Sequence, residues 1–252
     1  MKDSSRLLSA ALLALTLPWM GAAELSAQSG GPGFLFRTPT VSLGLRSGYS
    51  VPRAASEVFD FTREQLTVET SDFRSAYWGG ELGIRVAPRV DVVLSVGSMR
   101  STTPSEFRDW VDTDDLPIEQ ETRFTTTPVS LAAKYFLADR GRSVGRFAWI
   151  PQRMSPYVGG GVGLVWHSFV QQGDFVDFET FDIFTSTIRS EGVATQVHGM
   201  AGLDVSLNKS LYLTGEARYG WAKGRLENSF FEDFDDMDLA GVQLTFGVSV
   251  RF

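Results

Sequence analysis

The chain has 252 residues, no cysteine and only two histidines, which excludes disulfide frameworks and thiolate metal sites and leaves little for histidine-based catalysis. Its formal net charge of −7 argues against nucleic acid as a partner. Twenty-five glycines beside nineteen phenylalanines favour a protein of strands and turns. We therefore expect no metal site and no cofactor.

The chain begins with the pattern of a secretory signal peptide. Lys2 and Arg6 give a positive start, and the apolar run 7–20 that follows is too short to span a bilayer comfortably. An uncleaved membrane anchor is the alternative interpretation. After this segment no apolar run approaches the ~18 residues of a transmembrane helix, so a membrane-embedded chain would cross with strands.

The expected cleavage site defines three parts of the chain. Small residues place the cut after Ala27, with Ala23 as the second choice. The signal peptide is then 1–27, a short periplasmic segment is 28–37, and 38–252 is a single barrel domain.

Eight later segments alternate apolar residues with other residues at a period of two, which predicts strands with two unlike faces. In chain order they are 40–49, 73–87, 90–100, 125–138, 156–170, 192–207, 210–222 and 241–252. The connections alternate between short and long, as in an up-and-down meander with short turns at one rim and long loops at the other. The connection 139–155 breaks this alternation, and it is either a long turn or a further hairpin.

Charge follows the same division of the connections. Four long connections hold most of the acidic residues, and we expect them to be extracellular loops. The opposite rim carries Arg140, Arg142, Arg146 and Arg153 in its one long connection. The predicted molecule has an acidic end and a basic end.

The composition of the face opposite the apolar one distinguishes a membrane barrel from a soluble sandwich. This face carries glycine and small residues together with charges in mid-strand, as a narrow closed barrel requires. A secreted soluble β-protein with solvated polar faces is the alternative. The predicted polar network of the lumen consists of Glu81, Arg85, Lys134, Asp204, Glu216, Arg218, His167 and His198.

Aromatic residues on the apolar face support the membrane interpretation. Trp78, Trp166 and Trp221 fall near the rim of the long connections, and Tyr135 falls near the other rim. Aromatic girdles of this kind bound the lipid-facing band of a transmembrane barrel. We predict that these four residues form the girdle.

With these features the chain resembles the small outer-membrane β-barrel proteins of Gram-negative bacteria, the eight-stranded OmpA/OmpX/OmpW-like group. SPYVGGGVGLVW (155–166), LYLTGEARYGW (211–221) and VQLTFGVSVRF (242–252) carry the resemblance. It implies an all-β fold: one closed antiparallel up-and-down transmembrane β-barrel of eight strands in the outer membrane, in contact with lipid and lipopolysaccharide. It also implies a C-terminal signal for the barrel-assembly machinery, formed by Leu244, Phe246, Val248, Val250 and Phe252.

Two functional classes follow. The leading hypothesis is a non-enzymatic barrel with a structural, adhesive or small-molecule passage role, whose lumen is narrow or plugged because side chains fill an eight-stranded interior. The alternative is a lipid-modifying enzyme using His167 and Ser168, although adjacent strand residues point to opposite faces. His167 and His198 share the inward face, either as a proton or metal site or as two buried polar residues. No catalytic residue is assigned.

The long connections also contain an aromatic cluster. Its members are Phe175, Phe178, Phe181, Phe184, Phe230, Phe231 and Phe234. Exposed phenylalanines in such numbers are unusual on a protein surface. Either they bind a hydrophobic small molecule or a partner surface, or they pack on one another as a cap above the barrel.

Overall fold

A computed structural model describes residues 33–177, 180–226 and 234–252. The predicted signal peptide (1–27) and the first half of the predicted periplasmic segment (28–32) lie outside the described residues. In the described parts of the chain, no helix is both long and apolar enough to cross a membrane.

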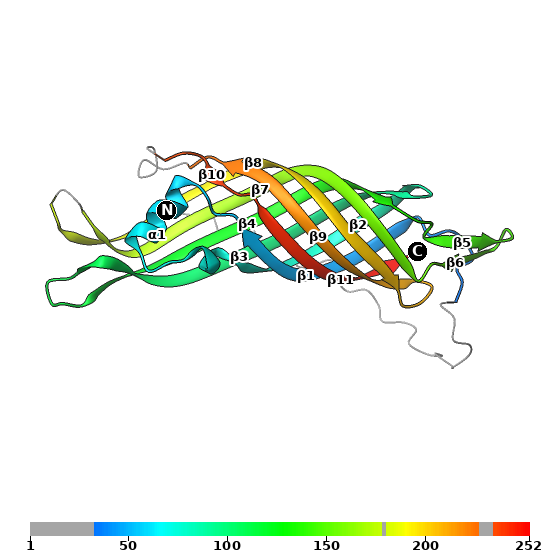
Figure 1. Ribbon diagram of the computed structural model, residues 1–252, viewed down its shortest axis with the longest axis horizontal. Coiled ribbons are helices and arrows are strands. Elements are labelled where there is room, and N and C mark those ends of the chain that lie inside the picture. Colours follow the sequence, from blue (N-terminus) through cyan, green and yellow to red (C-terminus); the bar gives the residue numbers. More distant parts are fainter. Residues whose placement is uncertain (1–32, 178–179, 227–233) are drawn as a thin grey trace, which may run out of the picture. The chain divides into compact units, whose positions relative to one another are not determined.

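Eight antiparallel strands of the described residues form one sheet that closes on itself (Figure 1). They are β1 (Val41–Pro52), β2 (Ser75–Ala87), β3 (Val90–Val111), β4 (Pro117–Phe136), β7 (Met154–Val176), β8 (Ile183–Ser206), β9 (Leu211–Gly224) and β11 (Gly241–Arg251). Each strand pairs with the next, and β11 pairs with β1 from Ser42↔Arg251 to Pro52↔Gly241. The predicted eight-stranded up-and-down barrel is confirmed.

The end of the barrel at which β1 ends and β2 begins carries three short elements. They are helix α1 (Glu57–Gln65), the 3-10 helix η1 (Thr70–Phe73) and strand β10 (Met237–Asp238), which pairs with β9. In Figure 1, α1 lies at one end of the barrel, and the hairpin of β5 (Gly141–Val144) and β6 (Ala148–Pro151) lies at the other.

That hairpin settles the question of connection 139–155. Strands β5 (Gly141–Val144) and β6 (Ala148–Pro151) pair with each other in a separate two-stranded sheet. Leu35 adds two backbone hydrogen bonds with Trp149 of β6. The connection therefore contains a hairpin, and this hairpin does not enlarge the barrel.

The strand faces have the arrangement of a transmembrane barrel. Leu45 of β1 is 75% exposed on the outer surface, whereas Lys134 of β4 is 3% exposed inside. Apolar side chains outside and charged side chains inside are the reverse of a soluble protein, and they match a barrel surrounded by lipid. The predicted inside-out arrangement is confirmed.

The outer surface changes from apolar to polar at a defined level. On the outer face of β4, β7 and β8, Trp166 lies in register with Val193. The next outward row consists of Thr125, Ser168 and Glu191, all polar. The predicted girdle residues Trp78, Trp166, Trp221 and Tyr135 all lie exposed on the outer surface.

Four strands continue well beyond this level. The sequence-based prediction of long loops at 101–124 and 171–191 is wrong, because β3, β4, β7 and β8 run through these residues. The connections that remain between these strands are residues 112–116 and residues 177–182. In these extensions the strands still alternate, but the apolar residues now point inward and the polar residues point outward. A search for strands with an outward apolar face therefore misses them. Ile118 and Phe124 point inward there, and Glu119 is exposed outside.

The glycine run of β7 has a steric reason. A Cβ at Gly161 would lie 2.4 Å from the carbonyl oxygen of Leu131, and a Cβ at Gly163 would lie 2.3 Å from that of Val129. The backbones of β4 and β7 approach each other so closely that an inward side chain has no room. Glycine therefore allows the sheet to curve sharply at this seam.

Candidate functional site

The membrane-spanning half of the lumen contains a group of buried charges, which we call the lumen network: Arg46, Glu81, Lys134, Glu216 and Arg218. Alternation along β1, β2, β4 and β9 points these side chains inward, since the intervening residues face lipid. Three cations and two carboxylates thus share one confined interior. Buried charges are tolerated only when they are paired and hydrogen-bonded.

Each carboxylate of the lumen network bridges two cations. Glu81 Oε1 accepts hydrogen bonds from Arg46 Nη2 at 2.8 Å and from Lys134 Nζ at 2.7 Å. Glu216 Oε1 accepts from Arg218 Nη2 at 3.0 Å, and Glu216 Oε2 lies 3.2 Å from Lys134 Nζ. Lys134 therefore joins the two carboxylates into one continuous chain of ion pairs.

Neutral partners complete the lumen network. Tyr157 donates its hydroxyl to Glu216 Oε2 at 2.7 Å, and its ring centroid lies 4.7 Å from Lys134 Nζ. Arg218 Nη1 lies 3.4 Å from Ser95 Oγ, which is 2.8 Å from Ser130 Oγ. Arg218 is on β9 and Ser95 is on β3, and these strands lie opposite each other in the ring. The contacts therefore cross the full width of the lumen.

Four predicted lumen residues lie elsewhere on the inward face. Arg85 donates to the backbone carbonyls of the turn that follows β2, and Asp204 accepts from Thr214 Oγ1 at 2.7 Å. His167 lies in register with Gly192. His198 is six positions further along β8, about 20 Å at a rise of ~3.3 Å per residue. The structure therefore does not bring the two histidines together.

The mouth of the lumen beside the β5–β6 hairpin is covered by side chains of this connection. Trp149 of β6 is buried there, and the guanidinium carbon of Arg251 lies 5.7 Å from its ring centroid. Arg140 Nη1 donates to Asp91 Oδ2 at 2.5 Å. A cavity of about 30 Å³ remains among these groups and Tyr212.

The turns at the same rim carry an exposed ion pair. Arg89 Nε donates to Asp139 Oδ1 at 2.8 Å. This hydrogen bond, together with the charge of Arg89, holds the pKa of Asp139 below its ordinary value. Both groups are exposed to solvent, so the pair contributes little to the stability of the barrel.

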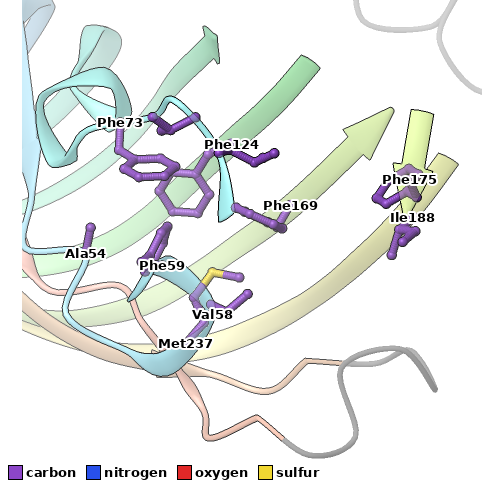
Figure 2. Packing of buried hydrophobic residues seen from close by; sticks show 11 residues of the cluster. Ala54, Val58, Phe59, Phe73, Phe124, Phe169, Phe175, Ile188 and Met237 are labelled. Carbon is purple, nitrogen blue, oxygen red and sulfur yellow. The ribbon is translucent and has the colours of Figure 1, made fainter. Parts of the chain in front are cut away.

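The opposite end of the lumen, where α1 lies, is filled by a different kind of core, which we call the upper core. Phe59 of α1 is fully buried in it, with ring centroids 4.8 Å from Phe73, 5.6 Å from Phe124 and 5.9 Å from Phe169 (Figure 2). Its members are Ala54, Val58, Phe59, Leu66, Val68, Phe73, Phe124, Phe169, Phe175, Ile188 and Met237. Helix α1 thus rests inside the extended strands and covers the lumen.

The two levels of the lumen are adjacent. A cavity of about 40 Å³ separates them, lined by Phe73 and Phe124 of the upper core and by Arg218 of the lumen network. Polar side chains such as Gln243 complete the boundary. The interior of the barrel therefore changes from apolar to charged within one layer of side chains.

The predicted aromatic cluster of the loops is divided among several sites. Phe175 belongs to the upper core, and Phe184 stacks on it with ring centroids 5.9 Å apart. Phe181 is 63% exposed and stacks on Trp110, and Phe234 is partly buried against the upper core. The remaining members lie outside the described residues: Phe178, Phe230 and Phe231.

The residues proposed as a C-terminal assembly signal form the outer face of the closing strand. Leu244, Phe246, Val248, Val250 and Phe252 are all exposed on the outer surface. The backbone of Phe252 exchanges hydrogen bonds with Val41, at 3.0 Å and 3.2 Å. The last strand is therefore paired to its end, and its role in assembly stays a prediction.

The sequence-based prediction missed Arg46 of the lumen network and Tyr157, the hydroxyl donor to Glu216. Both occupy positions that alternate with the outward apolar residues of their strands, so the same period of two identifies them as inward. Among the described residues, no group of three or more histidine, aspartate or glutamate side chains is placed to hold a metal ion.

Comparisons with known proteins find similar solved structures only. No protein-family model matches the chain, and no curated protein matches it. Among solved structures it is similar to Neisserial surface protein A (12% identity, 85% of this chain and 98% of that chain, TM-score 0.47). It is also similar to a major outer membrane protein from Thermus thermophilus (12% identity, 86% of this chain and 100% of that chain, TM-score 0.46). A third similar structure is OprG from Pseudomonas aeruginosa (14% identity, 86% of this chain and 99% of that chain, TM-score 0.45).

Proposed function

We propose that this chain is an integral protein of the bacterial outer membrane with a structural or adhesive role, whose barrel anchors its extracellular end and passes no solute. The carrying observation is that two unlike layers fill the lumen. The lumen network crosses it at the level of lipid, and the upper core with α1 covers it above.

Passage through the lumen would require both layers to open. The cavities on either side of the lumen network measure about 30 and 40 Å³, enough for only a few water molecules. Breaking a buried ion pair leaves uncompensated charge, which costs about 3–5 kcal/mol. An ion or a small solute would meet this cost and would also have to displace Phe59.

The outer surface supports residence in lipid. The apolar band meets acyl chains, and the row of Thr125, Ser168 and Glu191 above Trp166 lies where polar headgroups begin. Lipid and lipopolysaccharide are therefore the proposed surroundings of the barrel. The proposal assigns no catalytic role, since His167 is 3% exposed and its neighbour Ser168 in β7 points to the opposite face of the strand.

Planar lipid bilayers test the proposal. Purified protein that shifts on a gel when heated, and is therefore folded, is expected to give no stable conductance steps in concentrated KCl. The variant Lys134→Ser/Glu216→Ser opens only the lumen network and is also expected to be silent. Combining it with Phe59→Ala opens both layers and is expected to conduct.

Discrete, stable steps from the unaltered protein would contradict a closed lumen and would favour the passage role. Conductance of the Lys134→Ser/Glu216→Ser variant alone would show that α1 does not seal the barrel. Either result would separate the contribution of one layer from that of the other.

A further inference from the structure

A cleft of about 330 Å³ lies at the extracellular end, between α1 and the inner face of the extended strands. Five phenylalanines supply most of its walls: Phe61, Phe107, Phe175, Phe184 and Phe234. None of the described residues that line it is charged. The cleft lies beside the upper core and extends it towards the outer rim.

The rings of the cleft wall support one another. The centroids of Phe61 and Phe234 are 5.4 Å apart in an edge-to-face contact, and Phe175 stacks on Phe184. Phe175 is buried, while Phe184 remains 46% exposed at the opening. The wall therefore combines a packed base with an open apolar edge, and such an edge favours an apolar occupant.

The size of the cleft limits its occupant. An apolar cavity of ~150 Å³ holds one benzene ring, so this volume corresponds to about two rings. It also falls within the range of ~300–1,000 Å³ that is typical of small-molecule sites.

Gln120 is one of the polar residues that line the cleft. Gln120 is 5% exposed, and its Nε2 donates to the backbone carbonyl of Asp174 at 2.9 Å, which fixes the orientation of the amide. Its Oε1 is then buried with no hydrogen-bond partner among the described residues. Gln171, another glutamine of the cleft wall, differs because its amide has a hydrogen-bond partner: its Nε2 lies 3.5 Å from Thr62 Oγ1. A buried acceptor without a donor is unfavourable, and a bound hydroxyl would satisfy it.

We propose that this cleft binds a neutral bicyclic aromatic molecule bearing one hydroxyl group. Its rings lie among the five phenylalanines, and its hydroxyl donates a hydrogen bond to Gln120 Oε1. The cleft opens at the extracellular end and is separate from the lumen network. The inference therefore goes beyond the proposed closed barrel, and it does not depend on whether the barrel conducts.

The test uses protein in lipid nanodiscs, because detergent would itself occupy an apolar cleft. The probe is 1-naphthol, titrated by fluorescence against empty nanodiscs, and 1-methoxynaphthalene is the matched probe that lacks a donor. We expect saturable binding of 1-naphthol that is about fivefold to tenfold tighter than binding of 1-methoxynaphthalene, the size of one net hydrogen bond.

Variants assign the binding to the cleft. Gln120→Leu is expected to remove the preference for 1-naphthol and to leave binding of 1-methoxynaphthalene within about twofold. Phe184→Ala should weaken both probes by about tenfold, because it removes one wall. Phe181→Ala is the matched control, since this exposed phenylalanine of the same hairpin does not line the cleft.

The proposal is overturned if 1-naphthol partitions equally into empty and loaded nanodiscs. It is also overturned if Gln120→Leu leaves the preference intact while the gel shift shows a folded barrel. A third contrary result is equal loss of binding in Phe181→Ala and Phe184→Ala. None of these results bears on conductance, so failure here is distinguishable from failure of the closed-lumen proposal.

Discussion

The two halves of β4 are built from one alternating strand, yet their inward faces are opposite in character. Between Ser130 and Phe136 the inward face includes Lys134, and the outward face carries Leu131. Between Pro117 and Phe124 the inward face carries Ile118 and Phe124, and the outward face carries Glu119. The strand is continuous, and only its surroundings change.

The difference shows that the medium outside the strand decides what is placed inside. Where lipid surrounds the barrel, the outer face takes the apolar residues and the charges turn inward, where they must pair. Where water surrounds it, the same strands build an ordinary apolar core around Phe59. The level of Trp166 marks the change on the outer surface, and the cavity of about 40 Å³ marks it inside.

The largest expected effect comes from the charged half. Glu216→Gln should lower the free energy of unfolding by about 3–5 kcal/mol, because Lys134 and Arg218 lose their shared carboxylate. Urea unfolding of protein refolded into lipid vesicles, followed by tryptophan fluorescence, measures it. Glu191→Gln is the matched control. The ion pair of Glu191 with Arg189 is exposed to solvent, so its loss should lower the free energy of unfolding by less than about 1 kcal/mol. Equal effects of the two substitutions would show that burial of the pair is unimportant.

The second test places the same charge on the outer face of β4 at two levels. Leu131→Arg should destabilise the barrel by about 2–4 kcal/mol, because the guanidinium meets lipid near the middle of the membrane. Glu119→Arg on the extension should change the free energy of unfolding by less than about 0.5 kcal/mol, because that face meets water. The same vesicle assay compares them. If both substitutions are tolerated, the outer band does not face lipid.

The smallest expected effect lies in the upper core. Phe59→Leu keeps the burial but loses the edge-to-face ring contacts, which should cost about 1–2 kcal/mol. Because α1 packs separately from the lumen network, the loss should appear as about tenfold faster trypsin cleavage after Arg63, with the barrel still folded on a gel. Phe61→Leu on the same helix is the comparison: it loses only the single edge-to-face contact with Phe234, so its effect on cleavage should be smaller. A fall in global barrel stability of the same size would show that the two halves unfold as one unit.

The sequence predicted the barrel well because one rule governs its membrane-spanning part. A period of two with an outward apolar face identified all eight strands, and it placed Glu81, Lys134, Glu216 and Arg218 inside. The same rule identifies Arg46 when it is applied to β1. Which of these charges meet was beyond sequence reasoning, because Lys134 and Glu216 are on strands that are not neighbours in the sheet.

The end of the barrel that carries α1 was predicted less well, for a physical reason. Its strands alternate in the reversed phase, so acidic residues such as Glu119 and Glu121 looked like loop residues. Helix α1 is short, and its burial depends on Phe124 and Phe169, which are far away in the sequence. The chamber in which α1 packs exists only once the barrel has closed.

The length of the β7–β8 hairpin has a mechanical consequence. Its register runs without a bulge through 23 residue pairs, from Met154↔Val205 to Val176↔Ile183. A force applied to the outer turn at 177–182 would pull both strands along their own axes. The hydrogen bonds to β4 and to β9 would then be loaded together in shear, not opened one after another. A tether attached at that turn would be held by the whole wall of the barrel.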